Sequence, residues 1–218
     1  TDFAKQTFLE KGFQNEKIIK NPYGVNLQEF SSNDFYKKNN NFFRIIYTVT
    51  VSVRKGVLYL LEVFQSLNLK NSELLIIGDI EKEVSDRIKN YKSNPKIIFK
   101  DPVKQSELKK FYNISDIFVT CSVEEGLSMV QLQAMACGLP VICTENSGGK
   151  EIINNNIDGY ILPIRNKDLL KDKILFLYKN RHICNEIGKN AQKKATKQFS
   201  WEMYGQKTIS IYQDLLKK

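Results

Sequence analysis

The sequence is poor in the residues that bind metals or act as paired nucleophile and base. Its 218 residues include one histidine and four cysteines, without C-x-x-C spacing or a histidine cluster beside them. His182 lies on a basic helical pattern with no nucleophile motif nearby, so we expect a surface residue. The four cysteines are Cys121, Cys137, Cys143 and Cys184, and three of the four fall inside apolar strand or helix patterns. Buried, reduced thiols are therefore favoured over a disulfide or a metal site, which points to the cytoplasm.

Long apolar runs are also missing. No run reaches the ~18 residues that cross a bilayer, and no basic-then-apolar leader opens the sequence. We therefore expect a soluble chain. The sequence contains no Asp-x-Asp pair, no P-loop and no metal-ligand cluster, so we expect no metal cofactor.

Positive charge is concentrated near the end of the sequence. The net charge is +9, and residues 165–218 carry 13 Lys or Arg against 5 Asp or Glu. Solvated helix faces are the favoured interpretation, and peripheral contact with an anionic membrane surface or a polyanionic substrate is the alternative. Nucleic acid is not an expected partner, because no binding motif and no aromatic interleaving accompany the lysines.

Apolar runs of strand length alternate with helical patterns through most of the chain. The runs are continuous, as in a parallel sheet covered on both faces. We therefore predict an α/β fold: a Rossmann-like, doubly wound parallel sheet of about six strands followed by C-terminal helices. The expected strands are Ile45–Val51, Glu73–Ile77, Lys96–Phe99, Ile117–Cys121, Pro140–Cys143 and Tyr160–Leu162. The expected helices are Asp2–Lys11, Val57–Leu67, Lys82–Tyr91, Ser106–Asn113, Met129–Cys137, Lys150–Asn154, Asp168–Tyr178, His182–Gln198 and Trp201–Leu216.

The stretch from Glu124 to Ile142 carries the strongest functional pattern. It predicts a strand end, an acidic loop, a short helix opened by Ser128, a glycine stop and a second buried strand. Glu125 then lies at the carboxyl edge of the sheet, while Gln133 lies about two turns into the helix. The helix N-terminus between them is suited to an anion. A sugar nucleotide would match this order of groups.

Two glycine-containing turns add candidate ligand contacts. Arg54 and Lys55 follow the first strand and precede a helix, where their charges can meet a phosphate. Such charged hydrogen bonds contribute about 1.5–3 kcal/mol each. The alternative is a basic pair on the surface. Gly148 and Gly149 form the second turn, and their role in ligand approach or in a tight turn is left open.

Residues 125–142 resemble a signature block of family 4 glycosyltransferases, which are retaining enzymes of the GT-B fold. The family block EGFGLxxLEAMAxGxPVI stands here as EGLSMVQLQAMACGLPVI, with Gln133 replacing the second glutamate of E-x7-E. The resemblance implies that Glu125 holds donor-sugar hydroxyls and Gln133 holds the ribose. It also implies that the helix start at Ser128 and Met129 faces the donor.

The resemblance extends to both glycine-containing turns. Lys55 matches the R/K-G lysine that binds the donor diphosphate and stabilises the leaving nucleotide. Many members carry Gly-Arg upstream, where this sequence has Val49 and Thr50, and Arg54 is a candidate substitute for that cation. Gly149 belongs to a GGKE version of the family's GGxxE turn.

The resemblance also implies a domain organisation. NPYGVNLQEF matches the family's interdomain junction, and the helix introduced by Phe199-Ser200-Trp201 is similar to the one that crosses back to the first domain. We therefore expect the C-terminal half of a GT-B enzyme. Residues 1–40 are the expected remnant of an N-terminal domain with its linker, 41–198 the nucleotide-sugar domain and 199–218 the crossover helix.

The resemblance implies a retaining glycosyltransferase, of the hexosyltransferase kind. This chain is expected to be the half that binds a UDP- or GDP-sugar, without turnover by itself. Its glycan or lipid acceptor would be held by the absent N-terminal domain. The departures at Val49, Thr50 and Gln133 motivate a second hypothesis, a non-catalytic sugar-nucleotide sensor or scaffold. A third is another GT-B activity such as an epimerase. A phosphorylase is disfavoured, because the sequence offers no pyridoxal-phosphate lysine context.

Overall fold

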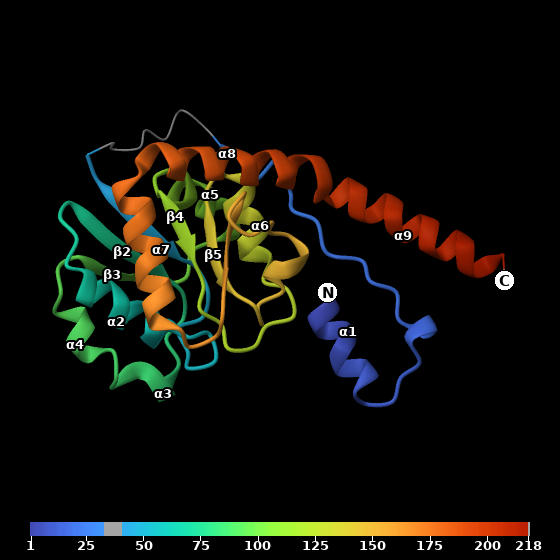
Figure 1. The fold of residues 1–218 in the computed structure, drawn as a ribbon, viewed down its shortest axis with the longest axis horizontal. Coiled ribbons are helices and arrows are strands. Elements are labelled where there is room, and N and C mark those ends of the chain that lie inside the picture. Colours follow the sequence, from blue (N-terminus) through green and yellow to red (C-terminus); the bar gives the residue numbers. More distant parts are fainter. Residues whose placement is uncertain (33–40, 218) are drawn as a thin grey trace.

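The computed structural model describes residues 1–32 and 41–217. Its centre is a six-stranded parallel sheet in the order β3-β2-β1-β4-β5-β6 (Figure 1). The predicted doubly wound sheet is confirmed. The strands are β1 Phe43–Tyr47, β2 Ser72–Ile77, β3 Ile97–Lys100, β4 Ile117–Val119, β5 Val141–Thr144 and β6 Gly159–Leu162.

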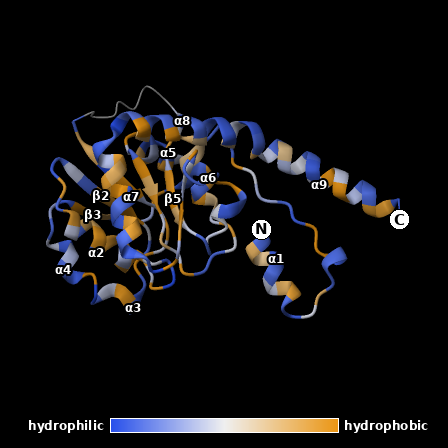
Figure 2. Ribbon diagram, in the orientation of Figure 1, coloured by the Kyte–Doolittle hydropathy of each residue, from blue (hydrophilic) through white to orange (hydrophobic). Residues whose placement is uncertain are grey.

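Helices cover both faces of the sheet. The α-helices are α1 Asp2–Leu9, α2 Val57–Leu67, α3 Lys82–Ser85, α4 Lys89–Lys92, α5 Gln105–Asn113, α6 Met129–Ala136, α7 Lys167–Lys179, α8 Arg181–Gln198 and α9 Trp201–Leu216. The buried apolar residues form two cores. Helices α2 and α7 pack with one set of alternate strand side chains in the first core, and α5 and α6 pack with the other set in the second. Helix α8 contributes to both cores. The apolar residues gather on the strands and on these inner helix faces (Figure 2).

Two predicted helices take a different form. The expected helix over Lys82–Tyr91 is divided into α3 and α4, because only Val84 and Ile88 are buried there and short helices depend on packing. The expected helix over Lys150–Asn154 is a single 3₁₀ turn over Gly149–Glu151. It ends because Asp158 accepts a hydrogen bond from the Asn154 amide, an arrangement that favours a turn over a helix.

The segment that precedes the sheet is tied to the start of α9. The Val25 amide donates to the Phe199 carbonyl at 2.7 Å, and the Trp201 amide donates to the Val25 carbonyl at 3.3 Å. Phe30 is fully buried and packs against the ring of Tyr112. Helix α9 projects beyond the sheet domain (Figure 1). Residues 33–40, at the end of the expected remnant and linker, lie outside the described residues.

The four cysteines are buried thiols, as predicted. Burial raises the pKa of the Cys121 and Cys143 thiols to about 12, so both stay protonated and unreactive at neutral pH. None of the described helices combines the length and the hydropathy needed to cross a membrane.

Gly56 is the N-cap of α2 and has a left-handed backbone conformation, with φ +68°. A Cβ atom at this position would lie 2.0 Å from the Cys121 carbonyl oxygen. We expect Gly56→Ala to lower the free energy of unfolding by about 1–3 kcal/mol through backbone strain, before any displacement of Cys121 is counted. Urea denaturation measures this change.

Gly205→Ala is the matched control. Gly205 lies inside α9, and a Cβ atom there would meet nothing within 4 Å. Alanine favours a helix over glycine by about 1 kcal/mol, so this variant should be neutral or more stable. If the two variants had the same free energy of unfolding, the close approach of Gly56 to Cys121 would be contradicted.

Candidate functional site

The strand order of the sheet reverses between β1 and β4. These two strands are neighbours, and their chain continuations run to opposite sides of the sheet. Open α/β sheets bind ligands beyond the carboxyl ends of their strands at such a switch point. The loop after β1 carries Arg54 and Lys55, and the loop after β4 carries Glu125 and Ser128. The fold therefore brings the main candidate residues to one edge.

Lys55 and Glu125 form an ion pair across this switch point. The Lys55 Nζ atom contacts the Glu125 Oε2 atom, and their side chains are only 11% and 19% exposed. Burial lowers the pKa of the Lys55 ammonium, and the neighbouring charge of Arg54 lowers it further, while Glu81 acts in the opposite direction. Two residues that are distant in sequence thus share one charged site.

Backbone contacts hold the two loops together beside the ion pair. The Val123 amide donates to the Arg54 carbonyl at 2.8 Å, and Arg54 Nη1 donates to the Glu124 carbonyl at 3.1 Å. The close approach of Gly56 to Cys121 lies in the same junction. Arg54 is exposed, so its guanidinium reaches the loop of Glu125 from the solvent side.

The loop after β5 supports the Glu125 loop from the other side. The Glu125 amide donates to the Asn146 carbonyl at 2.8 Å. Gly148 has φ +71°, and a Cβ atom there would lie 2.3 Å from the Gly126 carbonyl oxygen. Gly149 is also buried, and a Cβ atom there would clash with the Cys143 sulfur. The glycine pair is thus needed for packing within the protein, and ligand contact by Gly149 stays a prediction.

Helix α6 begins beside this junction. Ser128 is its buried N-cap, with φ −82° and ψ 111°, and Met129 is its first residue, as the sequence predicts. The Ser128 side chain makes no capping hydrogen bond. The positive end of the helix dipole is therefore available to an anion at the carboxyl edge of the sheet.

Gln133 is tied to the end of β1 through a residue that the sequence analysis missed. The Tyr112 hydroxyl lies 2.7 Å from Thr48 Oγ1 and donates to Gln133 Oε1 at 3.3 Å. Thr48 directly follows β1, so Gln133 belongs to the switch-point region. In the sequence Tyr112 is one aromatic in an amphipathic helix, and nothing there connects its hydroxyl to a glutamine 21 residues away.

A second ionic cluster joins the N-terminal segment to the GGKE turn. Lys20 binds Glu151 at 2.9 Å and Asp2 at 2.8 Å, and these hydrogen bonds raise the pKa of Lys20. Next to it, a cavity of about 490 Å³ lies between α1, residues 18–23 and the loop of Glu125 to Leu127. No sequence pattern indicates Lys20, because its partners lie far away along the chain.

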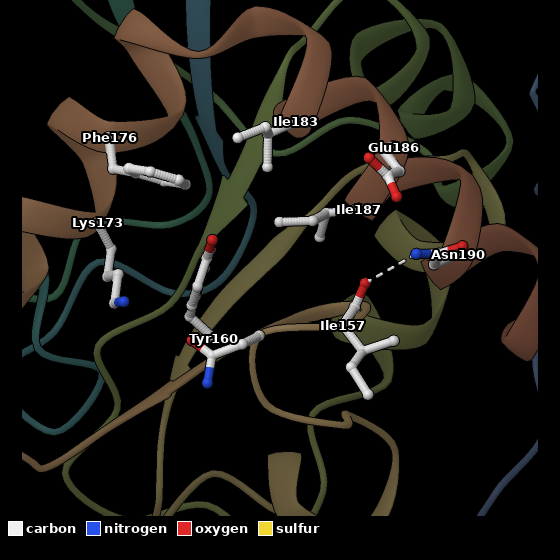
Figure 3. Close-up of a pocket in the computed structure, with 9 residues that line it drawn as sticks. Ile157, Tyr160, Lys173, Phe176, Ile183, Glu186, Ile187 and Asn190 are labelled. Carbon is white, nitrogen blue, oxygen red and sulfur yellow. Dashed lines mark hydrogen bonds between the residues drawn. The ribbon is translucent and has the colours of Figure 1, made fainter.

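A second hollow, of about 440 Å³, lies between β6, α7 and α8. Lys173 and Phe176 face it from α7, and Glu186 and Asn190 face it from α8, with Tyr160 between them (Figure 3). The Asn190 amide group donates to the Ile157 carbonyl at 3.1 Å. None of the predicted site residues lines this hollow, so it is separate from the switch point.

The basic residues of α7 and α8 are partly neutralised by neighbours. Lys167 pairs with Glu62 at 2.8 Å, and Lys194 pairs with Asp158 at 3.3 Å. Besides Lys167, the lysines that lie exposed on the two helices are Lys171, Lys179, Lys189, Lys193 and Lys197. Contact of this surface with a membrane stays a prediction.

The chain is similar to known glycosyltransferases. It is 28% identical over 212 residues to an uncharacterized glycosyltransferase of Methanocaldococcus jannaschii, covering 90% of this chain and 53% of that protein. It also resembles the crystal structure of a glycosyltransferase from Rickettsia africae, with 26% identity and a TM-score of 0.87, over 100% of this chain and 62% of that one.

A more distant likeness concerns the fold alone. The structure of Anabaena HepE in complex with UDP and glucose has a TM-score of 0.86 and 17% identity, over 97% of this chain and 61% of that one. The chain spans about half the length of the curated relatives it matches. Residues 29–194 match the family model described as glycosyl transferases group 1. This chain therefore belongs to the group 1 glycosyl transferase family.

Proposed function

We propose that this chain is the donor-binding part of a retaining glycosyltransferase. In this proposal it binds a nucleoside diphosphate sugar at the switch point between β1 and β4. Lys55 holds the diphosphate, Glu125 holds hydroxyls of the donor sugar and Gln133 holds the ribose. The acceptor, a glycan or a lipid, is bound by a further domain of the GT-B enzyme.

The ion pair of Lys55 with Glu125 is the observation that carries this proposal. The two side chains neutralise each other at the edge where sheets of this type bind ligands. A diphosphate offers Lys55 a partner of higher charge than one carboxylate. Once Lys55 turns to the diphosphate, the Glu125 carboxylate can accept hydrogen bonds from sugar hydroxyls. The same pair thus changes partners when the donor binds.

The charges at this edge also suit the chemistry of sugar transfer. Negative charge develops on the nucleoside diphosphate as its bond to the sugar breaks. Preorganised cations stabilise such charge without reorganisation during the reaction. We assign this role to Lys55, to Arg54 at the same loop junction and to the N-terminus of α6. In this proposal these groups take the place of a metal ion.

A hexose carried by UDP is the donor we favour, with GDP as the second candidate. The UDP and glucose of the HepE complex support this choice, because that protein shares the fold of this chain. A non-catalytic sugar-nucleotide sensor is the alternative function, favoured by Gln133 and by the absence of arginine at Thr50. A sensor would bind the donor but would not transfer its sugar when joined to an acceptor-binding domain.

A thermal-shift panel of UDP, GDP, ADP and their sugars tests donor binding. A ligand at ~100 times its dissociation constant stabilises the folded state by about 2.7 kcal/mol. For a chain of this size, we expect at least one nucleoside diphosphate to raise Tm by about 5–10 °C. Uridine, guanosine and pyrophosphate are the controls, since each offers only part of the ligand. Unchanged melting with every nucleotide would overturn the proposal.

Lys55→Ala should weaken binding of the diphosphate about 10- to 100-fold, because it removes one charged hydrogen bond and leaves Glu125 without its cation. The affinity for the nucleoside alone should hardly change. Isothermal titration with UDP and with uridine gives both values. Adding Glu125→Gln to this variant should restore part of the affinity by removing the uncompensated anion.

Lys110→Ala is the matched control for the loss of a paired lysine. Lys110 pairs with Glu107 at 3.2 Å on the exposed side of α5. This variant should bind UDP as the unaltered chain does. If Lys55→Ala weakens UDP and uridine binding equally, Lys55 acts on the structure and not on the phosphate.

A further inference from the structure

The hydroxyl of Tyr112 lies in a fully buried position between two polar side chains. Tyr112 is 0% exposed, and its ring packs against Phe30 and Phe118. Its oxygen is 2.7 Å from Thr48 Oγ1 and 3.3 Å from Gln133 Oε1. The hydroxyl is therefore held in an apolar surrounding with two partners, one at the end of β1 and one on α6.

The Gln133 oxygen that faces Tyr112 gives these contacts a direction. Burial holds the pKa of Tyr112 well above its usual range, so the hydroxyl keeps its proton at all physiological pH values. Tyr112 donates this proton to Gln133 Oε1, and the Thr48 hydroxyl donates to the oxygen of Tyr112. The hydrogen bonds thus run from Thr48 through Tyr112 to Gln133.

The two ends of the Gln133 amide therefore have different surroundings. The oxygen faces Tyr112, so the NH2 group on the other branch of the planar amide points away from it. Within the part of the chain that the structure describes, this NH2 group makes no hydrogen bond. Gln133 is 5% exposed, so the protein encloses almost all of this residue. A glutamate at this position would have two equivalent oxygens instead.

We infer that Tyr112 is a positioning residue that makes Gln133 a hydrogen-bond donor to a ribose hydroxyl oxygen. The inference rests on the proposed function, and it names how that site recognises ribose. A glutamate at position 133 accepts from a ribose hydroxyl, whereas the oriented glutamine donates to it. The direction of one hydrogen bond is reversed, while the preference for ribose over deoxyribose is kept.

Binding of ribose and deoxyribose nucleotides tests this inference. The probes are UDP or GDP, whichever gives the larger shift in the panel, with the matching 2′-deoxy and 3′-deoxy diphosphates. The unaltered chain should prefer the ribose form roughly 3- to 10-fold over at least one deoxy form, as one neutral hydrogen bond allows. Tyr112→Phe should remove most of this preference, because the amide is then free to turn. Its affinity for that deoxy form should stay the same.

Gln133→Glu supplies the control background. A carboxylate has two equivalent oxygens, so its orientation does not matter, and the variant should keep or increase the ribose preference. Adding Tyr112→Phe to Gln133→Glu should then leave the preference unchanged. A merely structural effect of Tyr112→Phe would appear equally in both backgrounds. Tyr178→Phe removes a hydroxyl that donates to the Lys70 carbonyl at 3.0 Å, and it should leave all affinities unchanged.

A ligand-independent measurement separates failure of this inference from failure of the proposed function. In NMR spectra of the chain alone, the Gln133 side-chain NH2 protons should show rapid exchange with water and weak contacts to the Tyr112 ring. Strong contacts to the ring would place the NH2 group against Tyr112 and would overturn the inference. An unchanged ribose preference in Tyr112→Phe would overturn it too, with donor binding intact. No nucleotide binding by the unaltered chain would overturn both.

Discussion

The ion pair between Lys55 and Glu125 is the interaction on which the candidate site depends. It requires two loops to meet above the sheet, and they can meet because β1 and β4 are neighbours at the switch point. Glycines allow the approach: Gly56 lies against Cys121, and Gly148 lies against Gly126. The sheet order, the two close backbone contacts and the charged pair therefore form one connected arrangement.

A largely buried ion pair is weak support for stability by itself. Removing two charges from water costs several kcal/mol per ion, and their attraction often only balances that cost. Apolar side chains of similar size would fill the same space at no such cost. The lowered pKa of Lys55 shows that burial works against its charge. A cation kept at the carboxyl edge of the sheet under this penalty therefore supports the proposed diphosphate site.

Much of the fold could be predicted, because strands and long helices carry periodic apolar patterns. Val57–Leu67 and Trp201–Leu216 were predicted with the bounds that the structure has, since caps and amphipathic periodicity agree there. The predictions failed at Lys82–Tyr91, where only Val84 and Ile88 are buried, and at Lys150–Asn154, where Asp158 accepts a hydrogen bond from the Asn154 amide. The sequence patterns place Lys55 and Glu125 in loops that follow strands, but their ion pair depends on the strand order seen in the structure. The contacts of Tyr112 and Lys20 did not, because they depend on side-chain packing between distant segments.

The two departures from the family pattern compensate each other in charge. The family motifs supply an arginine and a lysine on the strand-β1 side, and two glutamates in E-x7-E. Here the arginine position holds Thr50 and the second glutamate is Gln133, so one cation and one anion are both missing. Lys55 and Glu125 then balance each other, and Arg54 leaves the loop junction with a net positive charge. The loss of the glutamate at position 133 therefore offsets the loss of the arginine at position 50, and the charge of the site stays compatible with the proposed diphosphate.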